Sequence, residues 1–343
     1  MRFPEFTERW DTYRIADILC IGNGRDYKHL SKGDIPVFGT GGYMTSVNEC
    51  LYEGETTFIG RKGTINKPFY YNGKFWTVDT LFYTHSFKRV IPKFVYCLFQ
   101  TINWLRYNEA SGVPSLSKDT IEKIKVRIPQ LDEQKKIAKL LSLLDERIAT
   151  QNKIIEKYES LIKGIAQHCI KESTSGNTYV KLGDICQITT GKLDANEQVD
   201  NGIYPFFTCA EQPFKIDSFA FDTEALLISG NGANLGYINY YNGKFNAYQR
   251  TYVLDIFSEN IQYIKWALKV LLPKRIAIEK SSSNTPYIVL STLSDLRLPI
   301  PNKSNQCHIA KLMQSLERKL SSQIALNGSY NKLKQYLLRQ MFI

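Results

Sequence analysis

The sequence has 343 residues, 43% hydrophobic and 13% aromatic, which fits a folded protein with room for two ordinary domains. Lys and Arg outnumber Asp and Glu by 44 to 33, giving +11, and both halves share the excess: 26 − 19 = +7 for the first half (1–171) and 18 − 14 = +4 for the second (172–343). No run approaches the ~20 apolar residues of a membrane span, and Met1–Glu5 lack the apolar stretch of a secretory signal. We therefore expect a cytoplasmic protein that contacts a polyanion at two places and no membrane.

The chain contains one pattern twice. Tyr71-Asn72-Gly73-Lys74-Phe75 recurs unchanged as Tyr241-Asn242-Gly243-Lys244-Phe245, an offset of 241 − 71 = 170. Arg14–Ile18 resembles Lys181–Ile185 at an offset of 181 − 14 = 167, and Gln134–Leu140 resembles Gln306–Leu312 at an offset of 306 − 134 = 172. The offset grows by only five along the chain, which indicates a duplication with small loop insertions.

The first part of each copy, 1–130 and 173–302, is predicted to be a mixed α/β domain. β-branched and aromatic runs at 56–59 and 225–228 indicate strands, and helical segments follow around 94–106 and 263–272. Asn72-Gly73 and Asn242-Gly243 predict tight hairpin turns, because such turns need positive φ at both central residues.

The second part of each copy, 131–172 and 303–343, is predicted to be a long helix. Asp132 and Ser304 stand where a helix N-cap is expected. Apolar residues then alternate three and four apart, as in a coiled coil. This seam contains Ile137, Leu141, Leu144, Ile148, Gln151 and Ile155 in the first helix and Ile309, Leu316, Leu320 and Gln323 in the second. The two glutamines are either buried and fix the register or lie at an exposed edge.

Together these elements predict an α+β fold. Two similar mixed α/β domains form a pseudo-two-fold repeat, and two long antiparallel coiled-coil helices separate them. The domains are 1–130 and 173–302, and the spacer helices are 131–172 and 303–343.

Catalytic and cofactor motifs are weak or missing. The sequence has no G-x-x-x-x-G-K-[ST] phosphate loop, and its seven scattered cysteines form no C-x-x-C pair that would suggest zinc. Asn284-Thr285-Pro286-Tyr287 is one residue from the N-P-P-Y signature of amino-methyltransferases, but the matching stretch of the first copy is Gly112-Val113-Pro114-Ser115. We interpret both stretches as structural and expect a non-catalytic chain that binds no cofactor or metal.

Three segments resemble the specificity subunits of type I restriction–modification enzymes. They are the opening Arg2-Phe3-Pro4-Glu5-Phe6 with Trp10, the helix start Leu131-Asp132-Glu133-Gln134-Lys135-Lys136, and the loop Ile59–Ile65. The resemblance implies two target-recognition domains that each read one half of a split, asymmetric site on double-stranded DNA. It further implies helices that dock two methyltransferase subunits, motor-nuclease subunits added for cleavage, and S-adenosylmethionine, ATP and Mg²⁺ bound by those partners. The second copy departs at Asn305-Gln306-Cys307-His308, which puts the details of docking on that helix in doubt.

Candidate DNA contacts combine long donors with glycines that permit close approach. Arg and Lys favour guanine edges, whereas Asn favours adenine. The candidates are Arg61, Lys62, Thr64, Asn66, Lys67 and Lys74 in the first copy and Asn231, Asn234, Lys244 and Arg250 in the second. For each residue alone, a solvated loop position is an equally good interpretation.

The sequence has three alternative interpretations of its function. The chain could serve a fused nuclease–methyltransferase of the type IIB kind, which the neighbouring genes would reveal. A stand-alone DNA adenine methyltransferase is opposed by the missing cofactor fingerprint, and a purely structural coiled coil leaves the two basic domains unexplained.

Overall fold

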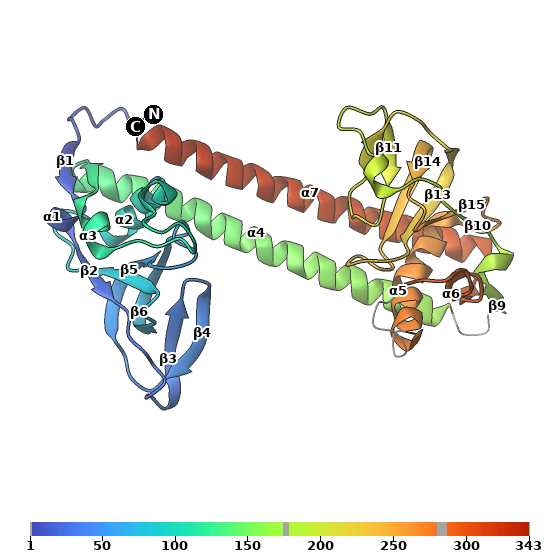
Figure 1. Ribbon diagram of the computed structural model, residues 1–343, viewed down its shortest axis with the longest axis horizontal. Coiled ribbons are helices and arrows are strands. Elements are labelled where there is room, and N and C mark those ends of the chain that lie inside the picture. The colour runs from blue at the N-terminus through green and yellow to red at the C-terminus, as the bar shows by residue number, and fades with distance from the viewer. Residues whose placement is uncertain (1, 174–177, 280–286, 343) are drawn as a thin grey trace. The chain divides into compact units, whose positions relative to one another are not determined.

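The structure, a computed structural model, describes residues 2–173, 178–279 and 287–342. The chain forms two compact units. The first unit comprises Met1–Lys153 with Ala325–Ile343, and the second comprises Ile154–Ile324. Each unit contains a six-stranded sheet, a two-stranded ribbon and parts of both long helices (Figure 1). The predicted α+β fold with two similar domains and two long helices is confirmed.

The sheet of the first unit has the strand order β2-β7-β5-β6-β3-β4. β3 is parallel to β6, and every other neighbouring pair is antiparallel. The strands are β2 (Cys20–Asn23), β3 (Lys32–Gly39), β4 (Gly42–Val47), β5 (Tyr52–Gly60), β6 (Phe69–Thr77) and β7 (Leu81–His85). A separate antiparallel ribbon pairs β1 (Asp11–Arg14) with β8 (Lys125–Ile128).

The sheet of the second unit repeats this topology strand for strand. Its order is β10-β15-β13-β14-β11-β12, and the parallel pair is again the equivalent one, β11 with β14. The strands are β10 (Gln187–Thr190), β11 (Tyr204–Phe207), β12 (Phe214–Ile216), β13 (Phe221–Ser229), β14 (Ile238–Ala247) and β15 (Thr251–Asp255). The ribbon here is β9 (Thr178–Lys181) with β16 (Arg297–Ile300). The repeat in the sequence is therefore a repeat in the fold.

The other α-helices pack against the sheet of their unit or against one another. In the first unit they are α1 (Ile15–Ile18), α2 (Pro92–Phe99) and α3 (Lys118–Lys123), and in the second α5 (Ile261–Glu279) and α6 (Leu290–Ser294). α2 begins with proline, whose fixed φ suits the first helical position. Its Phe94 and Phe99 are completely buried, and Phe99 meets the buried Trp104 edge to face at 5.3 Å. These aromatic contacts explain why so short a helix is stable here.

The long helices, α4 (Leu131–Glu172) and α7 (Lys303–Met341), contribute to both cores. In the first unit, Ile137 and Leu141 of α4 are buried with Leu338 of α7 in one cluster. In the second unit, Ile162 of α4 is buried with Met313 of α7. Each unit is thus completed by residues from distant parts of the chain.

Within the first unit the two helices run antiparallel. Lys334 of α7 pairs with Asp145 of α4, and Asn327 of α7 donates a hydrogen bond to Asn152 of α4. The residue numbers of α7 therefore fall along the contact as those of α4 rise. The predicted seam faces inward: Gln151 is only 4% exposed. The remaining seam residues Leu144, Ile148, Ile155, Ile309, Leu316, Leu320 and Gln323 are half-buried.

The predicted hairpin turns at Asn72-Gly73 and Asn242-Gly243 are wrong. Both dipeptides lie inside long strands, β6 and β14, where Asn72 pairs with Glu55 and Asn242 with Glu224. The residues on both sides pair with the neighbouring strand instead of with each other, so the chain does not reverse. The glycines still use positive φ, +140° at Gly73 and +128° at Gly243, to distort the strand locally.

The predicted N-caps lie two positions too late. α4 begins at Leu131, so Asp132 lies in the first turn, where its negative charge favours the positive end of the helix dipole. α7 begins at Lys303, and its cap is Asn302, whose side-chain oxygen accepts from the Asn305 N–H at 2.9 Å. Ser304 is a helical residue.

Candidate nucleic-acid interface

Two loops at the ends of equivalent strands contain most of the predicted contact residues. The first loop starts at Arg61, directly after β5, and the second at Gly230, directly after β13. In each sheet the adjacent strand begins directly after Thr80 or Arg250. Arg61 is therefore equivalent to Gly230, and Thr80 is equivalent to Arg250.

Backbone hydrogen bonds join three segments at the first loop. The Arg61 N–H donates to the Thr80 carbonyl at 2.8 Å, and the Leu116 N–H donates to the Arg61 carbonyl at 2.8 Å. The Gly63 N–H donates to the Pro114 carbonyl at 2.8 Å. Gly63 has φ +91°, a conformation that a β-branched or bulky side chain rarely adopts. We call residues 61, 80 and 116 the first junction.

The second loop is held in the same way. The Gly230 N–H donates to the Arg250 carbonyl at 2.8 Å, and the Ile288 N–H donates to the Gly230 carbonyl at 2.9 Å. Gly232 has φ +79°, like its equivalent Gly63. We call residues 230, 250 and 288 the second junction. The two junctions share one backbone scheme and carry different side chains.

The Arg61 side chain is exposed, but two contacts within the protein restrict its orientation. Its guanidinium donates to the Asp79 carbonyl at 3.2 Å and lies 5.9 Å from the centre of the Phe82 ring. An aromatic face attracts a cation and limits its orientations. The side chain is therefore held at the first junction by two contacts and remains exposed there.

Arg250 lies beside a small polar cavity at the second junction. The cavity has a volume of about 290 Å³, and Gly230, Tyr252 and Ile288 line it with Arg250. Burial raises the pKa of the Tyr252 phenol, and the positive charge of Arg250 partly offsets that rise. The arginine thus stands close to Tyr252, the equivalent of Phe82.

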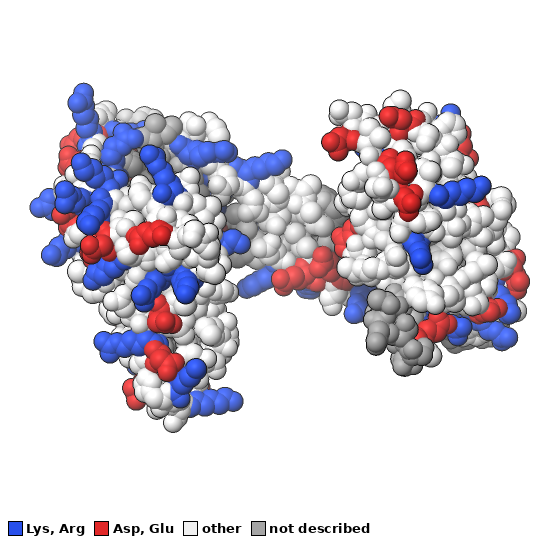
Figure 2. Space-filling view, in the orientation of Figure 1, with Lys and Arg blue, Asp and Glu red and all other residues white. Residues whose placement is uncertain are grey.

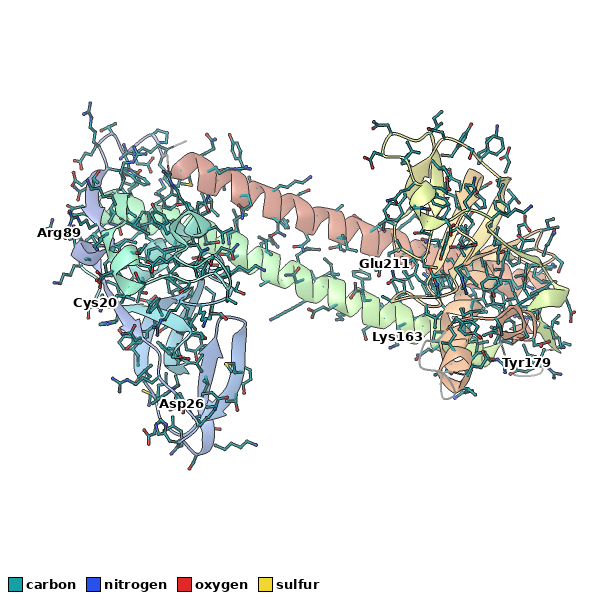
Figure 3. All side chains as sticks on the ribbon, in the orientation of Figure 1. Cys20, Asp26, Arg89, Lys163, Tyr179 and Glu211 are labelled. Atoms are coloured by element: carbon teal, nitrogen blue, oxygen red, sulfur yellow. The ribbon has the colours of Figure 1, made fainter. Side chains whose placement is uncertain are left out.

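Two predicted contacts of the second copy are engaged within the protein. The Asn231 side-chain oxygen accepts from the Cys209 thiol at 3.0 Å, and the Asn234 side-chain amide donates to the Cys209 carbonyl at 3.0 Å. Both residues are half-buried. They hold the neighbouring loop, which also carries the Glu211 labelled in Figure 3. Their positions indicate a supporting role at the second junction.

The remaining candidates divide by position. Lys62, Asn66 and Lys67 are exposed on the first loop, where Thr64 is half-buried. Lys74 and Lys244 lie elsewhere, because they pair with Glu53 and Asp222 near the opposite ends of β5 and β13. At ~3.3 Å per residue, five ladder steps put Lys74 about 16 Å along the sheet from the end of the ladder next to the loop. The structure therefore does not bring these two lysines to the junctions.

Sequence reasoning missed the third segment of each junction. The N–H groups of Leu116 and Ile288 bond to loops that are distant from them in sequence. In the sequence, these two residues are related to each other only by the offset of the repeat, 288 − 116 = 172. The stretch that resembles the methyltransferase signature, Asn284–Tyr287, directly precedes Ile288 in the sequence. Asn284–Pro286 lie outside the described residues, and the matching Pro114 and Ser115 hold the first loop through its backbone.

Charge is distributed unevenly over the two units. On the face drawn in Figure 2, Lys and Arg gather on the first unit, whereas Asp and Glu stand among fewer basic residues on the second. This agrees with the larger positive excess of the first half of the sequence.

Comparisons with known proteins identify the family. The model of the type I restriction modification DNA specificity domain matches twice, at residues 7–160 and 174–327. The chain belongs to the type I restriction–modification specificity family. The EcoDI specificity subunit of Escherichia coli is 41% identical over 143 residues, 42% of this chain and 32% of that protein. The alignment thus spans about a third of that relative's length.

Two further relatives extend over most of the chain. The MjaVIII specificity subunit of Methanocaldococcus jannaschii is 25% identical over 320 residues, 78% of this chain and 71% of that protein. The crystal structure of a type I restriction–modification S subunit from M. genitalium matches with a TM-score of 0.73 at 17% identity, covering 97% of this chain and 96% of that one. This likeness shows that the specificity-family fold is shared.

In this member of the specificity family, both units contain an equivalent groove beside a long helix. The first, of about 510 Å³, lies between the start of α2 and α4, and the second, of about 500 Å³, between α5 and α7. Ser142 and Glu146 line the first, and their equivalents Gln314 and Arg318, at the offset 314 − 142 = 172, line the second. The same surface therefore occurs twice with different charge.

Two features are absent from the residues that the structure describes. No helix among them combines the length and the apolar character needed to cross a bilayer. Within the same residues, no three His, Cys, Asp or Glu side chains are placed together to hold a metal ion.

Proposed function

We propose that this chain is the non-catalytic DNA-recognition subunit of a type I restriction–modification enzyme. Each unit reads one half of a split, asymmetric site on double-stranded DNA. The observation that carries the proposal is the pair of junctions: one backbone scheme, built twice, that presents different side chains. A repeated scaffold with unlike side chains suits the reading of two unlike half-sites.

Charge and exposure support DNA as the ligand. Both halves of the sequence are basic, by +7 and +4, and Arg61, Lys62 and Arg250 are exposed at the junctions. Basic side chains supply the sequence-independent attraction to phosphates, while base edges are read by a few placed donors. Glycines next to those donors allow the backbone to approach the DNA closely.

The long helices are the proposed docking sites for two methyltransferase subunits. A groove that occurs once in each unit, beside α4 and beside α7, suits two copies of one partner. Motor-nuclease subunits would join this complex for cleavage. We assign S-adenosylmethionine to the methyltransferase subunits, and ATP and Mg²⁺ to the motor-nuclease subunits.

The test is reconstitution with the methyltransferase subunit of its own system. The complex is expected to methylate a split, non-palindromic site, and the purified chain alone is expected to transfer no methyl group and to bind no labelled S-adenosylmethionine. A continuous or palindromic methylated site would contradict the proposed division of the target. Methyl transfer by the pure chain would contradict the non-catalytic role.

Two groove variants and one control variant test the docking surface. Ser142→Glu and Glu146→Arg change the first groove, and Lys163→Ala changes an exposed residue of the same helix that does not line it. The groove variants are expected to reduce the number of methyltransferase subunits bound from two to one, and Lys163→Ala to leave two. Two subunits on the groove variants would show that docking uses another surface.

A further inference from the structure

Each junction contains one arginine, but the two arginines come from different strands. In the first junction the arginine is residue 61, after β5, and the position before β7 is Thr80. In the second junction the position after β13 is Gly230, and the arginine is residue 250, before β15. Backbone hydrogen bonding makes these positions adjacent in both units, since residue 61 bonds residue 80 and residue 230 bonds residue 250.

The second junction cannot carry its arginine at position 230. A Cβ atom there would lie 2.4 Å from the Arg250 carbonyl oxygen and 3.2 Å from the Tyr252 ring. The first distance is shorter than real Cβ contacts allow, so this position is restricted to glycine unless the loop moves. Because Gly230 has no side chain, the space beside it stays open as the cavity that Arg250 lines.

Both arginines are next to equivalent aromatic residues. Arg61 lies over Phe82, and Arg250 lines one cavity together with Tyr252, which occupies the same place in its sheet. A flat guanidinium against an aromatic ring loses less orientational freedom when it binds a planar partner through two hydrogen bonds. The most frequent such partner in DNA is the O6/N7 edge of guanine.

We propose that Arg61 and Arg250 perform the same task, each reading one guanine in the half-site of its own unit, and that the position after the first strand and the position before the second are interchangeable sources of this arginine. This inference rests on the proposed function. It predicts that the arginine of the first junction can be moved from position 61 to position 80 without changing the base pair that is read.

The experiment uses the complex with methyltransferase and DNAs mutated separately in each half-site. Arg61→Ala is expected to lose about 5- to 150-fold discrimination at one G·C pair of one half-site, the range of a bidentate contact. Arg250→Ala is expected to do the same in the other half-site. Lys125→Ala, an exposed lysine of the separate β1–β8 ribbon, is the matched control and is expected to leave discrimination unchanged.

The decisive variant is Arg61→Gly with Thr80→Arg, which gives the first junction the arrangement of the second. Discrimination at the same G·C pair is expected to return, whereas Arg61→Gly alone stays defective. Failure of this rescue in a complex that still assembles and reads the other half-site overturns the interchange. A uniform loss of affinity on all DNAs, with a salt dependence flattened by about one unit, would identify a phosphate contact and overturn base reading.

Failure of the inference and failure of the proposed function give different results. If the wild-type complex reads a split site and both arginine variants keep full discrimination in both halves, only the arginine assignment is wrong. If the wild-type complex does not recognise a split site, the proposed function itself is wrong. If both variants alter the same half-site, the assignment of one arginine to each half is wrong.

Discussion

Gln134 and Gln306 form the same buried bridge in the two units. The Gln134 side chain accepts from the Ile91 N–H at 3.0 Å and donates to the Pro129 carbonyl at 2.9 Å. Gln306 accepts from the Asn260 N–H at 3.0 Å and donates to the Pro301 carbonyl at 2.8 Å. Each glutamine thus ties the start of α2 or α5 to the start of its own long helix.

The two bridges differ in one contact. Gln134 also donates to the Arg89 carbonyl at 2.8 Å, and Arg89 is labelled in Figure 3. Gln306 instead donates to the Glu259 carboxylate at 2.6 Å. Both glutamines are at most 1% exposed, so water does not compete for these hydrogen bonds.

Replacing Gln134 or Gln306 with Ala is expected to destabilise its own unit. The change leaves a buried N–H and buried carbonyl groups without partners, each worth about 1–3 kcal/mol. The expected loss in the free energy of unfolding is about 3 kcal/mol, measured by denaturant titration with hydrogen exchange to separate the units. Gln130→Ala, an exposed glutamine just before α4, is the control with an expected change below about 0.5 kcal/mol. Equal losses for Gln130→Ala and Gln134→Ala would refute the bridge's role.

The sequence allowed the equivalence of these glutamines to be predicted, because a duplication preserves order even where no contact is visible. The same offsets correctly paired the strands and the two long helices. Gly63 and Gly232 could likewise be matched, and both have positive φ. Periodicity located the inward face of α4, since burial repeats every three or four residues.

Local patterns failed where distant residues decide the structure. Asn72-Gly73 is a good hairpin signal in isolation, but pairing along β5 keeps the chain extended through it. Trp10 and Phe342 contact each other although they lie near opposite ends of the sequence, and no short motif predicts such a contact. The different positions of Arg61 and Arg250 depend on backbone hydrogen bonds between segments that are distant in sequence, which no local pattern predicts.

Replacing Arg2 with Ala is expected to destabilise the first unit. Arg2 donates two hydrogen bonds to the Glu133 carboxylate, at 2.7 and 2.6 Å, and Glu133 is only 1% exposed. Without Arg2 this carboxylate remains buried but has lost the cation that offsets its desolvation. The expected loss in the free energy of unfolding is about 2 kcal/mol, which is less than for a fully buried ion pair because Arg2 is partly exposed. The double variant Arg2→Ala with Glu133→Gln should lose less than the sum of the two single changes, as a double-mutant cycle would measure.

An exposed arginine provides the control for that cycle. Arg9→Ala removes a cation from the same segment, and its expected effect is below about 0.5 kcal/mol. Simple additivity of Arg2→Ala and Glu133→Gln would mean that the two side chains do not interact.

Glu259 is expected to make the second unit sensitive to acid. Burial acts to raise the pKa of this carboxyl, but hydrogen bonds from Gln306 and Lys303 outweigh it, and the net pKa lies below the ordinary value of 4.5. A folded-state pKa below the unfolded one contributes stability above the unfolded pKa and loses it as pH falls through the folded pKa. Denaturation between pH 6 and 3 should therefore show a smaller acid-induced loss in Glu259→Gln than in the wild type. Parallel curves for the two proteins would argue against this linkage.

The end of α7 is expected to stabilise the first unit, although the second unit precedes it in the chain. Leu338 is 2% exposed within the core cluster that also contains Ile137 of α4, and Phe342 stacks on Phe94 with ring centres 5.4 Å apart. Leu338→Ala removes buried methyl groups and leaves a cavity, at an expected cost of about 3 kcal/mol. Tyr336→Ala, on the exposed side of the same helix at 46% exposure, is the matched control and should cost below about 0.5 kcal/mol.

Hydrogen exchange measured by mass spectrometry locates the effect of Leu338→Ala. The amides of β5, β7 and α2 are expected to exchange faster, because their protection depends on the stability of the core that Leu338 completes. β13 and β15 have their own core around Leu226 and Leu254 and should change less. Faster exchange confined to α7, with β5 and β7 unchanged, would show that the end of this helix covers a core that is stable without it.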